Sequence, residues 1–177
     1  MNLQSNDFEL FALPVQFAQD RSVIDACWKE LQREAHPDSF AAQGAAAQRV
    51  AMQWSVRINE AYQRLKDPLK RAAYLCELHG APIDAHHNTS MPAEFLMQQM
   101  AWREALEDAV NEVELHQLND QVQQRRSEVL QQCEHLLDAE HNYAQAAELV
   151  RALMFIERFA HNIEARFDRM DTADRGQ

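Results

Sequence analysis

The segment from residue 45 to residue 66 constrains the fold more than any other part of the chain. Its apolar residues recur at steps of 3, 4, 3 and 4, at Ala51, Trp54, Ile58, Ala61 and Leu65. This spacing places them on one face of a helix. A second stripe predicts another helix over about residues 20–35, formed by Val23, Cys27, Leu31 and Ala35 with Ile24 and Trp28 beside it. Because a short loop separates the two helices, we expect an antiparallel hairpin.

The other segments also have helical patterns, and only 3 glycines and 5 prolines occur in 177 residues. A short helix is expected within residues 6–13, and another follows from Pro68, where Asp67 is a good N-cap. Three longer helices with spacings typical of a three-helix bundle are expected over residues 93–113, 115–138 and 143–168. The apolar stripe of the first extends to Val110 and Val113. The predicted fold class is therefore all-α.

Residues 79–92, HGAPIDAHHNTSMP, lack helical periodicity and are rich in turn formers, which predicts a linker. The charge changes at the same place: residues 1–80 carry 9 basic and 10 acidic side chains, whereas residues 81–177 carry 8 and 18. We therefore expect two domains, over residues 1–78 and 93–177. The acidic surface repels phosphate backbones, which argues against nucleic acid as a partner. It suits a basic protein partner, or solubility alone.

No apolar run reaches the length of a membrane span, and no basic segment followed by an apolar one begins the chain. A cytoplasmic protein that does not bind membranes is the simplest expectation. Cys27, Cys76 and Cys133 are far apart and form no C-x-x-C, which argues against disulfides and structural zinc. The histidines follow no metal-binding motif either. We expect no metal site and no cofactor.

The sequence QREAHPDSFAAQ, residues 32–43, interrupts the hairpin with His36, Pro37 and Asp38. Pro37 cannot continue a helix and disfavours α geometry at His36, while Asp38 can accept hydrogen bonds from backbone amides. The triplet is thus expected at the tip of the hairpin, where it could be a catalytic imidazole–carboxylate pair, a plain turn or a docking element. No nearby Ser or Cys nucleophile and no Gly-rich loop accompany it, which disfavours the catalytic pair.

A resemblance favours docking. HPD between two helices, followed by INEAYQRLKDPLKRAAYL at residues 58–75, is similar to the J domain, and FELFALP at residues 8–14 resembles its short first helix. Farther along, FLMQQMAWREALEDA at residues 95–109 and VRALMFIERF at residues 150–159 resemble the HscB-type J-proteins. This resemblance covers nearly the whole chain. It implies an L-shaped protein in which a J domain is joined to a three-helix bundle that binds the client.

HscB-type proteins are co-chaperones of iron–sulfur cluster assembly. They bind the cluster scaffold protein and deliver it to a specialised DnaK-type chaperone, whose ATPase they stimulate. The resemblance implies that His36, Pro37 and Asp38 contact this chaperone, with Asp38 paired with an arginine there. It also implies that Lys29 and Arg33 steer and hold the complex, although a merely solvated helix face is the alternative for these two. The protein is then not itself an enzyme.

The scaffold site implied by the resemblance lies on the bundle, at Leu96, Met97, Met100, Glu104, Asp108 and Phe155. In the sequence, residues 96, 100, 104 and 108 follow i, i+4 steps along one stripe that begins apolar and ends acidic. Leucine and thioether side chains suit an adaptable binding surface. The alternative is that Leu96, Met100 and Phe155 are ordinary core residues.

Two positions depart from the J-domain pattern, because Ala35 and Ser39 stand where an aromatic residue and a lysine are common. Docking should therefore depend less on charge at the loop. Two alternatives remain for the chain as a whole: a J-protein with a different client, and a helical hydrolase that uses His36 and Asp38.

Overall fold

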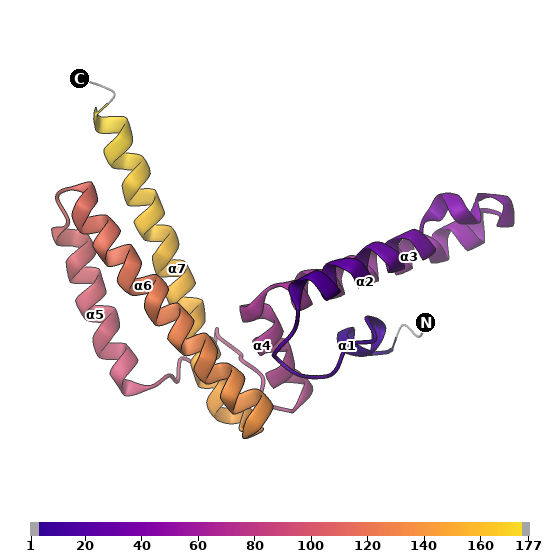
Figure 1. Ribbon diagram of the computed structural model, residues 1–177, viewed down its shortest axis with the longest axis horizontal. Coiled ribbons are helices and arrows are strands. Elements are labelled where there is room, and N and C mark those ends of the chain that lie inside the picture. Colours follow the sequence, from indigo (N-terminus) through magenta and orange to yellow (C-terminus); the bar gives the residue numbers. More distant parts are fainter. Residues whose placement is uncertain (1–3, 175–177) are drawn as a thin grey trace. The chain divides into compact units, whose positions relative to one another are not determined.

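The computed structural model describes residues 4–174, and within this range every regular element is a helix (Figure 1). The chain divides into two units, Met1–Leu78 and His79–Gln177. The first contains α1 (Asp7–Leu10), α2 (Arg21–Glu34), the 3-10 helix η1 (Pro37–Gln43), α3 (Ala45–Lys66) and α4 (Pro68–Leu78). The second contains α5 (Ala93–Asp108), α6 (Glu112–Glu134), the π-helix η2 (His135–Ala139) and α7 (Tyr143–Asp174). The all-α fold class expected from the sequence is confirmed.

Helices α2 and α3 form an antiparallel hairpin. Hydrogen bonds between them join positions that rise on one helix as they fall on the other: Arg21 to the Lys66 carbonyl, Trp28 to Asn59 and Gln32 to the Ser55 carbonyl. Buried Ile58, Ala61 and Leu65 line the inner face of α3, as the periodicity predicts. On α2 the buried residue is Ile24, whereas Val23 is 44% exposed. At the beginning of α2, the buried face thus carries Ile24 in place of the expected Val23.

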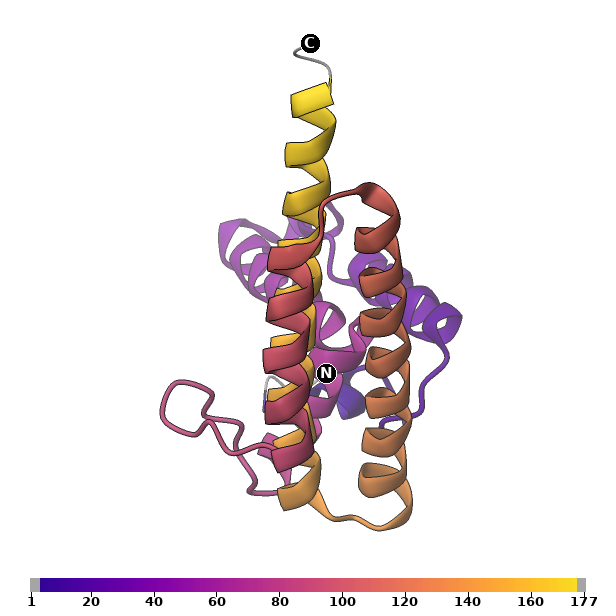
Figure 2. The same ribbon diagram turned by 90° about the vertical axis from the view of Figure 1, so that its left-hand side faces the viewer.

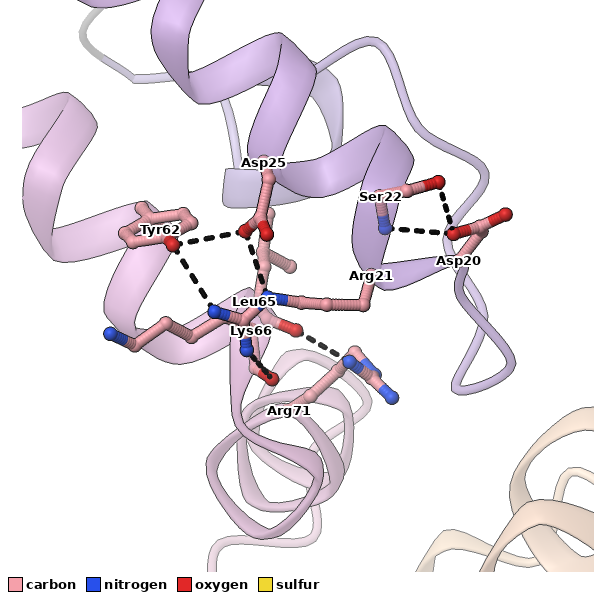
Figure 3. A network of polar contacts seen from close by, with 8 residues as sticks. All are labelled: Asp20, Arg21, Ser22, Asp25, Tyr62, Leu65, Lys66 and Arg71. Atoms are coloured by element: carbon pink, nitrogen blue, oxygen red, sulfur yellow. Dashed lines mark hydrogen bonds and ion pairs between the residues drawn. The ribbon is translucent and has the colours of Figure 1, made fainter.

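A polar network joins the start of α2 to the end of α3 (Figure 3). Arg21 donates to the Asp25 carboxylate (Nε–Oδ1 2.8 Å), to the Tyr62 hydroxyl (3.2 Å) and to the Lys66 carbonyl (3.2 Å). The hydrogen bond from Arg21 is the main cause that lowers the pKa of Asp25. Asp20 caps α2 by accepting hydrogen bonds from the Ser22 hydroxyl and backbone N–H, which lowers the pKa of Asp20 as well. The open end of the hairpin is held by these charges.

A buried carboxylate attaches α1 to α3. Asp7 is 0% exposed, and its carboxylate oxygens lie 2.7 Å from Arg57 Nη1 and 2.7 Å from Arg64 Nε. Neither of these short contacts is a hydrogen bond, but Arg64 Nη2 donates one to Asp7 Oδ1 at 3.3 Å. The attachment therefore combines Coulombic attraction with one charge-assisted hydrogen bond. The Asp7 N–H also donates to the Tyr74 hydroxyl at 3.0 Å. Burial is the main cause that raises the pKa of Tyr74.

In the second unit, the first long helix is shorter than its pattern predicts. Helix α5 ends at Asp108, because Asn111 begins α6 by accepting a hydrogen bond from the Glu114 N–H (3.0 Å). The Glu114 carboxylate in turn accepts one from the Val110 N–H (2.8 Å). Val110 and Val113 are consequently 79% and 65% exposed, so their assignment to the inner stripe is wrong. A strong N-cap thus overrides the apolar period.

Helix α6 packs along α7, with α5 completing the bundle (Figure 2). Aromatic rings bridge α5 to α7: Phe95 meets Phe155 edge-on at 5.7 Å between centroids, and Trp102 stacks on Phe159 at 5.5 Å. The irregular segment before α5 is also attached to this unit. Buried Arg151 of α7 donates to the carbonyls of Ile83 (3.0 Å) and Ser90 (2.6 Å).

Candidate functional site

The His-Pro-Asp triplet lies where α2 stops and η1 begins. The N–H of Ala35 closes the last turn of α2, and His36 then adopts an extended conformation (φ −66°, ψ 126°). Pro37 occupies the first position of η1, which its fixed φ and missing N–H allow. Sequence reasoning expected the Asp38 carboxylate to organise this corner. The structure instead uses the imidazole, because His36 Nδ1 accepts the Asp38 N–H at 3.2 Å.

Both polar side chains of the triplet remain available. The side chains of His36 and Asp38 are 58% and 89% exposed, and Nδ1 and Oδ2 lie 3.7 Å apart. With Nδ1 accepting a backbone hydrogen bond, Nε2 carries the proton of the neutral ring and can donate to a partner. Within the described residues, no arginine or lysine forms an ion pair with the Asp38 carboxylate. It is therefore free to accept a bidentate arginine.

A hydrolase site needs more than this pair. Catalytic groups work in concave sites that hold a substrate and exclude water. A pocket of about 450 Å³ does lie beside the loop, lined by Ala35, Phe40, Val50, Trp54 and neighbours. Neither His36 nor Asp38 lines it. The pocket is an apolar recess between α2, η1 and α3, and the exposed pair has the geometry of a contact surface.

The two basic residues expected to steer the chaperone lie on the exposed surface of α2. Arg33 Nη2 is 3.4 Å from Glu30 Oε1, with both side chains largely in solvent. Such a contact is worth little and is readily exchanged for another. Lys29 is exposed as well. Both cations can thus meet a partner, although a solvated helix face has the same appearance.

The stripe on α5 is exposed over its whole length. Leu96, Met97 and Met100 are 48%, 75% and 74% exposed, and Glu104 and Asp108 are exposed too. The alternative that Leu96 and Met100 belong to the core is therefore wrong. Single exposed apolar residues are ordinary, but three of them within two turns, followed by acids on the same stripe, form a contiguous amphipathic surface.

Phe155 of α7 joins this surface as a half-buried ring. It is held by Phe95 at 5.7 Å and by Phe159 at 6.0 Å, and the guanidinium of Arg103 lies 5.7 Å from its centroid. The ring is thus rigidly placed between α5 and α7, which lowers the entropy that a partner must remove on binding. The ring therefore lies against α5, the helix that carries the exposed stripe.

Sequence reasoning missed two arginines beside this ring. Arg103 and Arg158 line a small pocket of about 190 Å³ together with Phe155 and Phe159. One signal was present in the sequence: Arg103 follows Met100 by three residues, and Arg158 follows Phe155 by three, so each lies one turn from a predicted contact residue.

Two further observations concern the kind of site. In the part of the chain that the structure describes, no group of three or more His, Cys, Asp and Glu side chains is placed to hold a metal ion. Among residues 4–174, no helix combines the length and apolar character that crossing a membrane requires.

Comparisons with known proteins agree on one family. Residues 91–164 match the family model described as the HSCB C-terminal oligomerisation domain. The co-chaperone protein HscB homolog of Burkholderia thailandensis is 48% identical over 174 residues, which cover 97% of this chain and 99% of the relative. The aligned range covers nearly the full length of both chains, so it spans both the triplet loop and the bundle.

Solved structures show the same fold. The chaperone HscB from Vibrio cholerae is 36% identical and superimposes with a TM-score of 0.80, covering 93% of this chain and 99% of that one. The human co-chaperone protein HscB is 22% identical, with a TM-score of 0.86 over 94% of this chain and 84% of that chain. The second likeness concerns the fold alone.

Proposed function

The chain belongs to the HscB family of co-chaperones, and on this premise we propose that it couples a client to the ATPase of a DnaK-type chaperone. The client is the scaffold protein of iron–sulfur cluster assembly, and the role is to deliver it and to stimulate ATP hydrolysis. The observation that carries the proposal is the pairing, in one chain, of an exposed His-Pro-Asp loop with an exposed apolar stripe. Two modest interfaces on one molecule raise the local concentration of client at the chaperone. We propose that the protein performs this role in the cytoplasm.

The chaperone interface is proposed at His36, Pro37 and Asp38, with Lys29 and Arg33 on α2. The exposed Asp38 carboxylate suits an arginine of the chaperone, and the protonated Nε2 of His36 offers a donor beside it. Lys29 and Arg33 add charge that steers the encounter and makes its rate depend on salt. The protein catalyses nothing itself in this proposal; it changes the barrier in the active site of its partner.

Steady-state ATP hydrolysis tests the chaperone interface. The protein alone should not hydrolyse ATP. Adding it to the DnaK-type partner should raise the rate at which that partner hydrolyses ATP. His36→Gln should abolish the acceleration, whereas His87→Gln, an exposed histidine in the other unit, should leave it intact. Hydrolysis by the isolated protein would favour the hydrolase alternative. Full acceleration by His36→Gln would refute the docking role of the loop.

The scaffold interface is proposed at Leu96, Met97, Met100, Glu104, Asp108 and Phe155. Exposed methionine and leucine beside a rigid half-buried ring provide apolar contacts, and the two acids at the end of the stripe add polar ones. Burying such side chains in a partner recovers hydrophobic free energy that the unbound protein leaves unused.

Calorimetric titration with the scaffold protein tests this second interface. Met97→Ala combined with Phe155→Ala should weaken binding at least tenfold, as expected when central contacts are truncated. Met97→Ala alone should also weaken it, and this variant cannot disturb the core because Met97 is 75% exposed. Val110→Ala, equally exposed but outside the stripe, is the matched control. Unchanged binding by the double variant would favour a J-protein with a different client.

A further inference from the structure

The acidic second unit has few basic residues, and most of those that the structure describes already have a polar partner. Residues 81–177 contain 8 arginines and no lysine, against 18 acidic residues. Five arginines have contacts within the unit: Arg125 with Glu128, Arg126 with Glu157, Arg151 with two carbonyls, Arg166 with the Ala109 carbonyl and Arg169 with the Ala165 carbonyl. Each of these guanidiniums therefore already has an anionic or carbonyl partner.

Arg103 and Arg158 differ from the others. Across residues 4–174, neither donates a hydrogen bond nor takes part in an ion pair, and the one polar-type contact of Arg103 is with the face of Phe155. Both are exposed, and they come from different helices, α5 and α7. Nevertheless they line the same pocket of about 190 Å³, whose apolar part is formed by Leu106, Phe155 and Phe159. Among the described arginines of the unit, the two without a hydrogen bond or ion pair thus line one pocket.

The charge and shape of this pocket select an anionic occupant. The charged residues that line the pocket are two arginines, Arg103 and Arg158, and one glutamate, Glu107. The pocket is therefore locally positive, although the unit as a whole is strongly negative. Guanidinium forks fit carboxylates in bidentate geometry. The aromatic floor lowers the local dielectric once a partner covers it, which strengthens the attraction. A volume of this size accepts one side chain rather than a larger ligand.

We propose that Arg103 and Arg158 bind an aspartate or glutamate side chain of the scaffold protein in this pocket. The inference rests on the proposed function, because the pocket shares Phe155 with the proposed scaffold interface. It adds a charged contact to a surface that is otherwise apolar and acidic. This contact orients the client on α5 and α7 and discriminates against proteins that offer only an apolar patch.

Charge reversal with a matched control tests the proposal. Arg158→Glu changes an exposed residue, so the fold should be retained, as circular dichroism can verify. It should weaken scaffold binding at least tenfold in calorimetric titration. Arg169→Glu makes the same change of net charge on an exposed residue farther along α7, and it should alter the affinity less than twofold. Raising the salt concentration should weaken wild-type binding more than binding by Arg158→Glu.

A rescue experiment identifies the partner group. Each exposed acidic residue of the scaffold protein is changed to arginine in turn, and one such variant should restore binding to Arg158→Glu. Wild-type affinity of Arg158→Glu, or equal losses in Arg158→Glu and Arg169→Glu, would overturn the inference. If the Met97→Ala plus Phe155→Ala variant still loses binding in that case, the proposed scaffold interface survives. If that variant also binds normally, the proposed function fails instead.

Discussion

Replacing Asp7 by asparagine should destabilise the first unit by about 3 kcal/mol. Asparagine keeps the shape of the side chain, and the backbone N–H of residue 7 can still donate to the Tyr74 hydroxyl. What is lost is the negative charge between two guanidiniums, each 2.7 Å away. The substitution thus isolates the electrostatic attachment of α1 to α3.

The magnitude follows from the burial of the three partners. Removing one member of a buried ion pair costs about 3–5 kcal/mol, because an uncompensated charge is left behind. Asp7 is 0% exposed, but the side chains of Arg57 and Arg64 are 18% and 41% exposed. Both arginines can therefore regain water after the substitution, and the lower end of the range applies. For Glu30→Gln, which disrupts an exposed contact with Arg33, the expected cost is below about 1 kcal/mol.

Native-state hydrogen exchange of the full-length protein is the assay, because it reports each unit separately. A loss of 3 kcal/mol corresponds to roughly hundredfold faster exchange, at about 1.4 kcal/mol for each factor of ten. The amides of α3 around Arg57 and Arg64 should show this acceleration in Asp7→Asn, and those of α6 and α7 should not. If hydrogen exchange of the α3 amides accelerated less than about fivefold, the buried charge of Asp7 would not be the main attachment of α1 to α3.

Three further predictions follow from other contacts. Ala35→Leu should fill part of the 450 Å³ recess beside the triplet and raise the free energy of unfolding by about 1 kcal/mol, measured by urea denaturation. Arg151→Lys should cost about 1–3 kcal/mol and speed hydrogen exchange in residues 83–90, because lysine lacks the planar guanidinium whose Nε and Nη1 reach the two carbonyls. The hydrogen bond from Arg21 lowers the pKa of Asp25, so the stability that it adds is complete above the unfolded pKa of about 3.8 and is lost as the pH falls through the lower, folded pKa. The urea midpoint of Asp25→Asn should therefore depend less on pH between about 5 and 2 than that of the wild type. Parallel plots of midpoint against pH for the two proteins would contradict this.

The helices and the position of the triplet could be predicted because the signals are local. Residues 45–66 form a helix over the range that their period indicates, and Asp67 accepts a hydrogen bond from the Lys70 N–H at the start of α4, as its side chain favours. Pro37 cannot lie in a helix interior and disfavours α geometry at His36, so a corner at His36 followed without knowledge of the fold. The end of α5 was misplaced because two local signals compete there, and the cap at Asn111 prevails over the apolar period.

The amino-acid sequence alone determined an all-helical chain with a polar triplet displayed between two long helices, since periodicity, caps and proline act within a few residues. Tertiary structure decided which apolar stripes are buried. A helical stripe shows that several residues share a face, but only packing reveals that Leu96, Met97 and Met100 face solvent while Phe155 is fixed among other rings. The pairing of Asp7 with Arg57 and Arg64 has the same origin, because it joins residues at least 50 positions apart. Long-range contacts of this kind depend on how whole helices pack, which no local pattern encodes.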